Sequence, residues 1–237
     1  MHRFLSHEPL AKNFSIHEGT RFHQISRVFR AKKGDKFVFF EPQGDDRVYE
    51  VVALSKKQID FTERETGYIL NKKKNLNITI FQAFPNKIAT IEILVQKLVE
   101  IGISKVVFFR SDRSQLHEVP AGKSSRLAAI AEEALEQSGG NNPITIIYKK
   151  DSLEKVFEND DQHMQHIVGY PNAKNTLTLD ANCTDYALWI GPEGGWSEEE
   201  EAFFRGKSAT FWTFNSNVLR LETASIVGAG ILAYLLE

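Results

Sequence analysis

The hydrophobic pattern of the first part of the chain predicts short β-strands. Three runs are rich in β-branched and aromatic residues: 36–40 (KFVFF), 47–54 (RVYEVVAL) and 57–63 (KQIDFTE). Turn residues, notably 42–46 (PQGDD), separate them, and this arrangement predicts a small antiparallel barrel or sheet. One helix, about 18–30, interrupts it. Its apolar residues are predicted to face the barrel: Phe22, Ile25, Val28 and Phe29.

The second part alternates between strand and helix patterns. Apolar residues at helical spacing predict helices at about 88–101, 124–138 and 222–236. Apolar runs predict strands at 76–84, 105–109, 144–148, 166–170, 186–190 and 210–214. Ser197 and Glu200 form an S-x-x-E capping box that opens one more helix. Such alternation predicts a mainly parallel α/β sheet, whose ligands bind beyond the carboxyl ends of the strands.

The distribution of charge separates the same two parts. The whole chain has a net charge of only −2. Residues 1–74, however, carry 15 Lys and Arg against 10 Asp and Glu, a net of +5, and the remaining residues carry 14 against 21, a net of −7. The segment 71–75 (NKKKN) contains no apolar residue and is predicted to be a linker. We therefore expect two domains, residues 1–72 and 75–237, of which the first meets an anionic partner.

Composition excludes several classes of protein. A hydrophobic fraction of 42% with 25% charged residues is typical of globular proteins. No apolar stretch approaches the roughly 20 residues of a membrane span, and the N-terminus lacks a signal-peptide core. We therefore expect a cytoplasmic protein that does not bind a membrane. Neither clustered cysteines nor an H-E-x-x-H motif occurs, which predicts no metal site. The glycine motifs of dinucleotide and Walker-type phosphate sites are also missing.

Three loops follow the last three predicted strands: 171–173, 191–196 and 215–224. The middle loop (GPEGGW) has three glycines in five residues, which allow the backbone to adopt positive φ and to approach a ligand closely. The helix after it offers free backbone N–H groups. On spacing alone, a tight strand-to-helix turn without any ligand explains this loop equally well.

Charged residues give further candidates. Arg220 follows a strand beside the glycine loop, where it could hold an anion or form a surface salt bridge. Glu222 suits the start of the last helix through the helix dipole. His23, Arg27 and Arg30 are spaced i, i+4, i+7 and would share one helical face. That face either binds nucleic-acid phosphates or is simply solvated.

The combination of 190–200 (IGPEGGWSEEE) with 217–225 (NVLRLETAS) resembles the RsmE family of ribosomal small subunit methyltransferases. Four other segments agree in order and spacing: 26–30 (SRVFR), 96–109 (QKLVEIGISKVVFF), 112–114 (DRS) and 136–140 (EQSGG). The resemblance runs from about residue 2 to the C-terminus. It implies an α/β protein with an N-terminal PUA-like β-barrel and a C-terminal SPOUT domain that contains a deep trefoil knot. It also implies formation of N3-methyluridine in 16S rRNA from S-adenosylmethionine.

In that family the cofactor adenosine lies among the three loops. Transferred motif by motif, the implied contacts are Gly169, Tyr170, Ile190, Gly191, Gly195, Val218, Leu219, Arg220, Thr223 and Ala224. Two positions depart from the family pattern, because Gly140 follows EQSG where an arginine is usual, and 215–217 (NSN) replaces a Gly-x-Arg. These departures leave open a SPOUT methyltransferase with another RNA target, such as a ribose 2′-hydroxyl or a tRNA base, or a non-catalytic rRNA-binding assembly factor.

Methylation of uridine N3 requires loss of its proton and stabilisation of the resulting anion. We assign the stabilising role to Arg220, with Glu222 as a candidate base and Glu193 as a weaker one. No metal is required, because the methyl donor is already activated. The last helix is apolar almost all round and has small residues at 228–230, which predicts close helix contact across a two-fold axis. The family likewise forms a homodimer whose partner chain completes each site.

Overall fold

The computed structural model describes residues 1–66, 76–120, 122–160, 163–174, 177–180, 182–214 and 217–236. The chain divides into two compact units, Met1–Lys73 with Leu135–Pro143, and Lys74–Ala134 with Ile144–Glu237. The predicted linker 71–75 lies outside the described residues.

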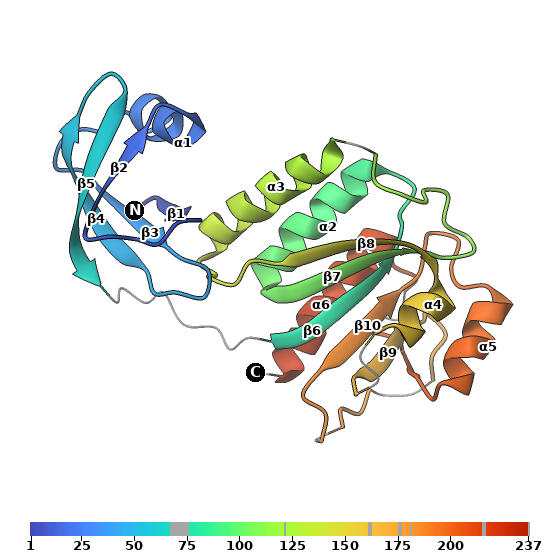
Figure 1. Cartoon of the computed structure of the whole chain (residues 1–237). Coiled ribbons are helices and arrows are strands. Elements are labelled where there is room, and N and C mark those ends of the chain that lie inside the picture. Colours follow the sequence, from blue (N-terminus) through green and yellow to red (C-terminus); the bar gives the residue numbers. More distant parts are fainter. Residues whose placement is uncertain are drawn as a thin grey trace. The chain divides into compact units, whose positions relative to one another are not determined.

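The first unit contains a five-stranded curled sheet in the order β1-β3-β4-β5-β2 (Figure 1). Its strands are β1 (Arg3–Leu5), β2 (Asn13–His17), β3 (Lys36–Phe40), β4 (Arg47–Leu54) and β5 (Gln58–Thr66). The pairs β3–β4 and β4–β5 are antiparallel, as expected, and β2, which the pattern did not predict, pairs antiparallel with β5. The edge strand β1 instead runs parallel to β3, so the sheet is mixed. The whole of 6–35 crosses over between these two strands, which a local pattern in β1 does not reveal.

The predicted helix 18–30 is shorter and less regular than its pattern suggests. A single α-helical turn, α1 (Thr20–His23), passes into a π-helical turn, η1 (Gln24–Val28). Phe22 and Ile25 are buried as expected, whereas Val28 is 64% exposed. A π-turn holds more residues than an α-turn, so the side chains within it depart from the α-helical face. The predicted inward orientation of Val28 is therefore wrong.

Residues 135–143 complete the first unit, although they comprise the end of a helix, Lys123–Ser138, that begins in the second unit, and the segment after it. Arg3, 7% exposed, forms a salt bridge with Asp46, 5% exposed, in which Nη2 and Oδ1 are 2.8 Å apart. Arg3 Nη1 also donates to the main-chain oxygen of Gly140 at 2.7 Å. The backbone N–H of Leu5 donates to Glu136 Oε1 at 2.9 Å. Buried charge-assisted hydrogen bonds thus attach this segment to the strand β1.

The second unit contains a parallel six-stranded sheet, in the order β11-β9-β10-β6-β7-β8. Its strands are β6 (Leu76–Ala83), β7 (Ile103–Arg110), β8 (Thr145–Ser152), β9 (Gln165–Gly169), β10 (Tyr186–Ile190) and β11 (Thr210–Trp212). Its helices are α2 (Ile88–Ile101), α3 (Lys123–Ser138), α4 (Leu153–Glu158), α5 (Glu198–Gly206) and α6 (Leu221–Leu236). The predicted parallel α/β sheet is confirmed; α4 is an additional short helix.

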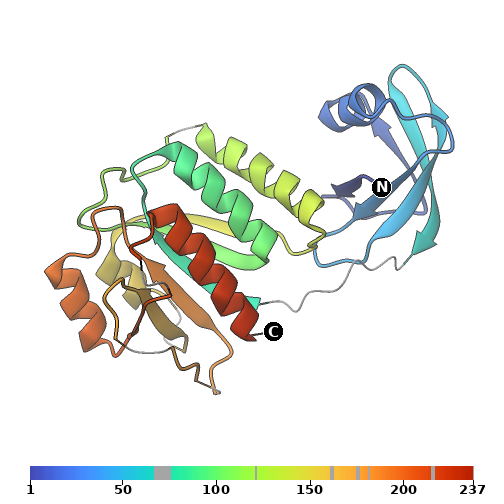
Figure 2. The same ribbon diagram turned by 180° about the vertical axis from the view of Figure 1, so that it is seen from behind.

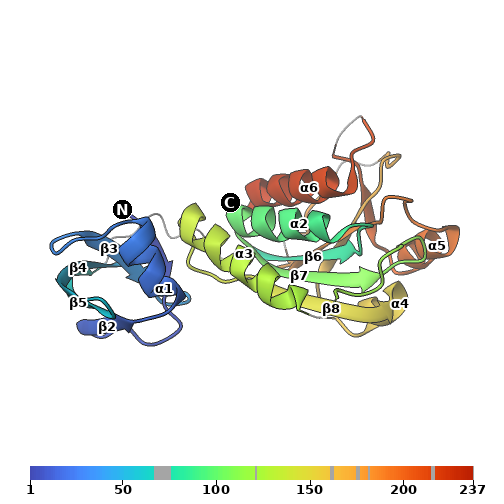
Figure 3. The same ribbon diagram turned by 90° about the horizontal axis from the view of Figure 1, so that it is seen from above.

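The helices of the second unit cover both faces of its sheet. Figures 2 and 3 show α2 and α6 side by side on one face, with α3 next to α2, and α4 and α5 on the other face. The buried core divides accordingly into two clusters, one between the sheet and α2, α3 and α6, and one between the sheet and α4 and α5. This sandwich explains the almost continuously apolar strands, which are buried on both faces.

Two details of the helices bear on the predictions. The capping box of α5 is confirmed, because Ser197 Oγ accepts from the Glu200 N–H at 3.1 Å and Glu200 Oε2 accepts from the Ser197 N–H at 2.9 Å. In α6, a Cβ on Gly228 would lie 3.1 Å from Leu188 Cδ2, on the sheet of the same chain. Gly228 therefore allows α6 to approach its own sheet, which differs from the close contact across a two-fold axis predicted for it. Among the described residues, no helix is both long and apolar enough to cross a membrane.

Candidate active site

A cavity of about 770 Å³ lies in the second unit, at the carboxyl ends of its parallel strands. Five loops meet there, because the carboxyl ends of parallel strands share one edge of the sheet. Its lining residues follow β6 (Asn86, Lys87, Thr90), β7 (Arg113), β9 (Gly169–Pro171), β10 (Ile190–Glu193, Gly195, Trp196) and β11 (Trp212–Phe214, Asn217–Glu222, Ala224), with Glu201 from α5.

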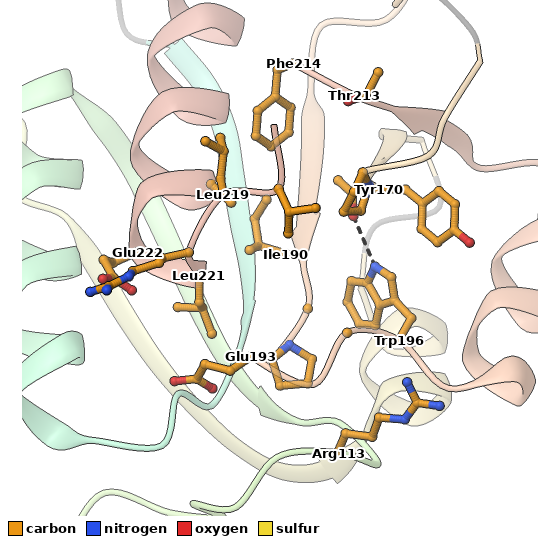
Figure 4. A pocket seen from close by; sticks show the side chains of 18 of the residues that line it. Arg113, Tyr170, Ile190, Glu193, Trp196, Thr213, Phe214, Leu219, Leu221 and Glu222 are labelled. Atoms are coloured by element: carbon orange, nitrogen blue, oxygen red, sulfur yellow. Dashed lines mark hydrogen bonds between the residues drawn. The ribbon is translucent and has the colours of Figure 1, made fainter. Parts of the chain in front are cut away.

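The loop after β10 forms one wall of the cavity and is held in place by Trp196. The indole Nε1 donates to the main-chain oxygen of Gly169 at 3.2 Å, the dashed line in Figure 4. A Cβ on Gly169 would lie 2.9 Å from Ile190 Cδ1, and one on Gly191 would lie 3.1 Å from Trp196 Cε2. These two glycines are required by close packing of the neighbouring loops. Gly195 has open space around its missing Cβ but a φ of +72°, so its backbone conformation favours glycine there.

The loop after β11 brings apolar and charged side chains together at the cavity. Leu219 is half-buried and Leu221 is buried, whereas Val218 is 80% exposed. Arg220 is exposed and, within the described part of the chain, forms no salt bridge or side-chain hydrogen bond. Glu222 is half-buried in the first turn of α6 and also lines the cavity. An arginine without a carboxylate partner can accept an anion from a ligand.

The acidic residues of the cavity differ in what they bind. Glu193 Oε1 accepts a hydrogen bond from the backbone N–H of Asn86 at 3.0 Å, so one of its oxygens already fixes the loop after β10. Glu201 forms a hydrogen bond with Tyr170, and this bond together with partial burial raises the pKa of the Tyr170 hydroxyl. Of the acidic residues that line the cavity, Glu222 therefore has the carboxylate that can bind a ligand. Among the described residues, no group of His, Cys, Asp and Glu is arranged to hold a metal ion.

The structure brings most of the predicted site residues into this one cavity. Nine of the ten residues predicted to contact the cofactor line it; Thr223 does not. The residues 215 and 216 of the third loop lie outside the described residues. His23, Arg27 and Arg30 belong to the first unit and are exposed. They do not form one α-helical face as their spacing predicted, because His23 and Arg27 belong to different helical turns and Arg30 has a φ of +53° beyond η1.

Sequence reasoning missed the contributions of β6 and β7. Asn86, Lys87 and Thr90 come from the start of α2, and Arg113 comes from the turn after β7. The signal was present, since the strand-end rule applies to every parallel strand of the sheet and not only to the last three. The central position of β6, between β10 and β7, makes its loop a direct neighbour of the glycine loop.

The cavity fits a flat, largely neutral group with hydrogen-bonding edges. Apolar side chains such as Ile190, Leu219 and Phe214 border it, and glycines at 169, 191 and 195 place main chain without side chains along its wall. Figure 4 shows these apolar side chains on one side of the space, with Trp196 across from them and the Tyr170 ring turned away. Backbone groups of this kind can recognise the edge of a nucleobase, and the apolar side chains can cover its faces. Adenosine meets that description.

Comparisons with known proteins agree on one family. The model of an RNA methyltransferase domain matches residues 72–233. Ribosomal RNA small subunit methyltransferase E 2 of Borreliella burgdorferi is 32% identical over 235 residues, covering 96% of this chain and 94% of that protein. Ribosomal RNA small subunit methyltransferase E of Aquifex aeolicus is 28% identical, covering 98% and 99%. The crystal structure of the corresponding Neisseria gonorrhoeae protein, bound to S-adenosyl methionine, has a TM-score of 0.87 at 21% identity and covers 99% and 98%.

Proposed function

This chain belongs to the RNA methyltransferase family that includes the ribosomal RNA small subunit methyltransferases E, and from that premise we propose that it methylates N3 of a uridine in 16S rRNA with S-adenosylmethionine as the donor. One observation carries the proposal: the glycine loop and the LRLETA motif, about 25 residues apart in sequence, form one cavity. That cavity presents Arg220, which has no salt-bridge partner among the described residues.

The cofactor site follows from the chemistry of the cavity. When bound, the sulfonium supplies a methyl group that needs no further activation. The chain holds the adenosine through main-chain groups of the loops after β9, β10 and β11, with Ile190 and Leu219 against the base. We assign contacts to Gly169, Tyr170, Ile190, Gly191, Gly195, Val218, Leu219, Arg220 and Ala224. Thr223 is not one of the residues that line the cavity, and we assign it a contact only through the family motif.

Two side chains serve the uridine. Loss of the N3 proton leaves a negative charge shared with O2 and O4, and the guanidinium of Arg220 stabilises that charge. Glu222, two residues further on, is the candidate to receive the proton. Glu193 is a poorer candidate, since one of its oxygens holds the Asn86 N–H. The uridine must leave its stack to enter the cavity.

The first unit supplies the RNA contacts in this proposal. Its strands form a PUA-like domain whose exposed His23, Arg27 and Arg30 meet phosphates of the small-subunit rRNA. The C-terminal part of the second unit adopts the SPOUT topology with its trefoil knot, which the likeness to the family supports. A cytoplasmic location follows from the ribosomal substrate.

We also infer a homodimer formed by the face that α2 and α6 present to solvent. Ile93 on α2 is 46% exposed, and Tyr234 and Leu235 on α6 are 77% and 49% exposed. The two helices lie side by side on one face of the sheet (Figure 2). Apolar side chains gathered on adjacent helices indicate an interface, and a two-fold dimer is the commonest solution.

Mass spectrometry of nucleosides from 16S rRNA tests the reaction. In cells that lack this protein we expect the loss of N3-methyluridine, and the purified protein with S-adenosylmethionine should restore it. Loss of a 2′-O-methylated nucleoside instead would assign another target. If no nucleoside changes and calorimetry detects no binding of S-adenosylmethionine, the chain is an rRNA-binding assembly factor and the proposal is wrong.

A further inference from the structure

Arg113 lies beside the glycine loop, below Trp196 in the view of Figure 4. Its Nη1 donates to the main-chain oxygen of Gly194 at 3.0 Å. A Cβ on Gly194 would lie 3.2 Å from Arg113 Cβ and 3.5 Å from Arg113 Cδ, so the arginine side chain lies directly across this residue. The absence of a side chain at position 194 therefore allows the arginine to reach the loop.

The backbone around Arg113 is itself fixed to the far end of the same loop. Ser197 Oγ donates to Asp112 Oδ2 at 2.6 Å, and the Asp112 N–H donates to Glu200 Oε1 at 3.1 Å. Glu200 is 1% exposed, so this anchor is buried. The loop after β7 thus holds the loop after β10 at two points: the start of α5 through Asp112, and the turn at Gly194 through Arg113.

Arg113 has no evident role in stability. Its side chain is exposed, and among the residues that the structure describes it forms no salt bridge. Exposed interactions of this kind contribute little to folding. The other side of the loop is held by Glu193, which accepts from the backbone of Asn86. Gly195, whose positive φ shapes the cavity wall, directly follows these two attachments.

We propose that Arg113 is a positioning residue, which holds the 192–195 turn in the conformation that receives the cofactor. The inference rests on the proposed function, because the ligand of this wall is taken to be S-adenosylmethionine. It adds a role for the loop after β7, of whose described residues Arg113 alone lines the cavity. Without the arginine the turn stays folded but samples other conformations. Ligand binding must then also order the turn, which lowers the affinity of the protein for the ligand.

Calorimetric titration with S-adenosylmethionine, combined with steady-state turnover of rRNA, tests this role in the full-length protein. We expect Arg113→Met to weaken cofactor binding about three- to tenfold, as loss of one charge-assisted hydrogen bond predicts. Turnover at saturating cofactor should stay within about twofold. Arg113→Lys should recover most of the affinity, since one N–H donor is enough to reach Gly194. Arg126→Met, which removes an exposed arginine of α3 paired with Glu92, is the matched control and should bind normally.

A second variant tests the contact from its other side. In Gly194→Ala the added Cβ displaces the arginine, so the variant should show a similar loss of affinity, and the double variant with Arg113→Met should be no worse than either single one. Unchanged affinity in Arg113→Met, a defect confined to the KM for RNA, additive losses, or an Arg113→Lys variant as weak as Arg113→Met would each overturn the inference. If the unmodified protein itself fails to bind S-adenosylmethionine, the proposed function has failed instead.

Discussion

The salt bridge between Arg3 and Asp46 predicts how the first unit responds to a single substitution. Arg3 Nε donates to Asp46 Oδ1 at 3.0 Å and to Oδ2 at 2.9 Å, and the guanidinium carbon lies 3.5 Å from the centre of the Phe40 ring. Both partners are more than nine-tenths buried. Arg3→Met leaves the Asp46 carboxylate buried without its partner and leaves the Gly140 oxygen without its donor. Removal of one member of a buried pair costs about 3–5 kcal/mol.

Urea unfolding measures this loss, and the chain provides separate probes for its two units. All three tryptophans, Trp189, Trp196 and Trp212, lie in the second unit. Tryptophan fluorescence therefore follows that unit, whereas far-UV circular dichroism follows both. For Arg3→Met we expect the dichroism midpoint to fall by about 2 M, as an m-value of about 1.5–2 kcal/mol/M implies. The fluorescence midpoint should change much less.

Two further variants test whether burial of the pair sets the size of the loss. Arg64→Met removes a partner from the exposed pair with Glu50 in the same sheet, whose side chains are 45% and 26% exposed, and should cost less than about 1 kcal/mol. The double variant Arg3→Met with Asp46→Leu removes both charges and should regain much of the stability. A loss below about 1 kcal/mol in Arg3→Met, or a double variant less stable than Arg3→Met, would refute the reasoning.

Three other predictions concern residues of the second unit. Burial lowers the pKa of His166 below its usual 6.5. Its contribution to the free energy of unfolding is therefore complete above about pH 6.5 and is lost as the pH falls. In His166→Gln, the free energy of unfolding in urea should change less between pH 7 and pH 5. Gly228→Ala should lower the Tm through contact with the sheet, whereas Gly230→Ala, with no atom within 4 Å of its added Cβ, should raise it by helix propensity. Arg220→Lys should reduce turnover by about 1 to 3 orders of magnitude with little change in cofactor affinity, because lysine lacks the planar fork.

Each of these predictions has a result that contradicts it. Equal pH slopes for the His166 variant and the unmodified protein would show that this histidine does not govern acid sensitivity. Equal shifts in Tm for Gly228→Ala and Gly230→Ala would show that close packing against the sheet does not require a glycine at position 228. Near-normal turnover of Arg220→Lys would assign stabilisation of the uridine anion to another group.

The sequence alone determined those features of this protein that depend on residues close together in the chain. The periodicity of 88–101 predicted α2 with its observed ends, and the S-x-x-E spacing predicted the cap of α5, because a helix and its cap depend on residues three and four apart. Strands buried on both faces were equally evident as apolar runs. The glycine loop and Arg220 were identified because strand-end loops of a parallel sheet converge wherever the sheet is found.

Only the tertiary structure decided the features that depend on a distant partner. The parallel pairing of β1 with β3 and the attachment of residues 135–143 to the first unit rest on contacts between residues more than 30 and more than 130 positions apart. The outward turn of Val28 follows from a π-turn that the apolar spacing cannot distinguish from an α-turn. The roles of Gly228 and Arg113 are also not evident from the sequence. Each depends on a side chain or carbonyl that a distant segment of the chain brings next to it. Local patterns specify the elements, whereas long-range packing selects their neighbours.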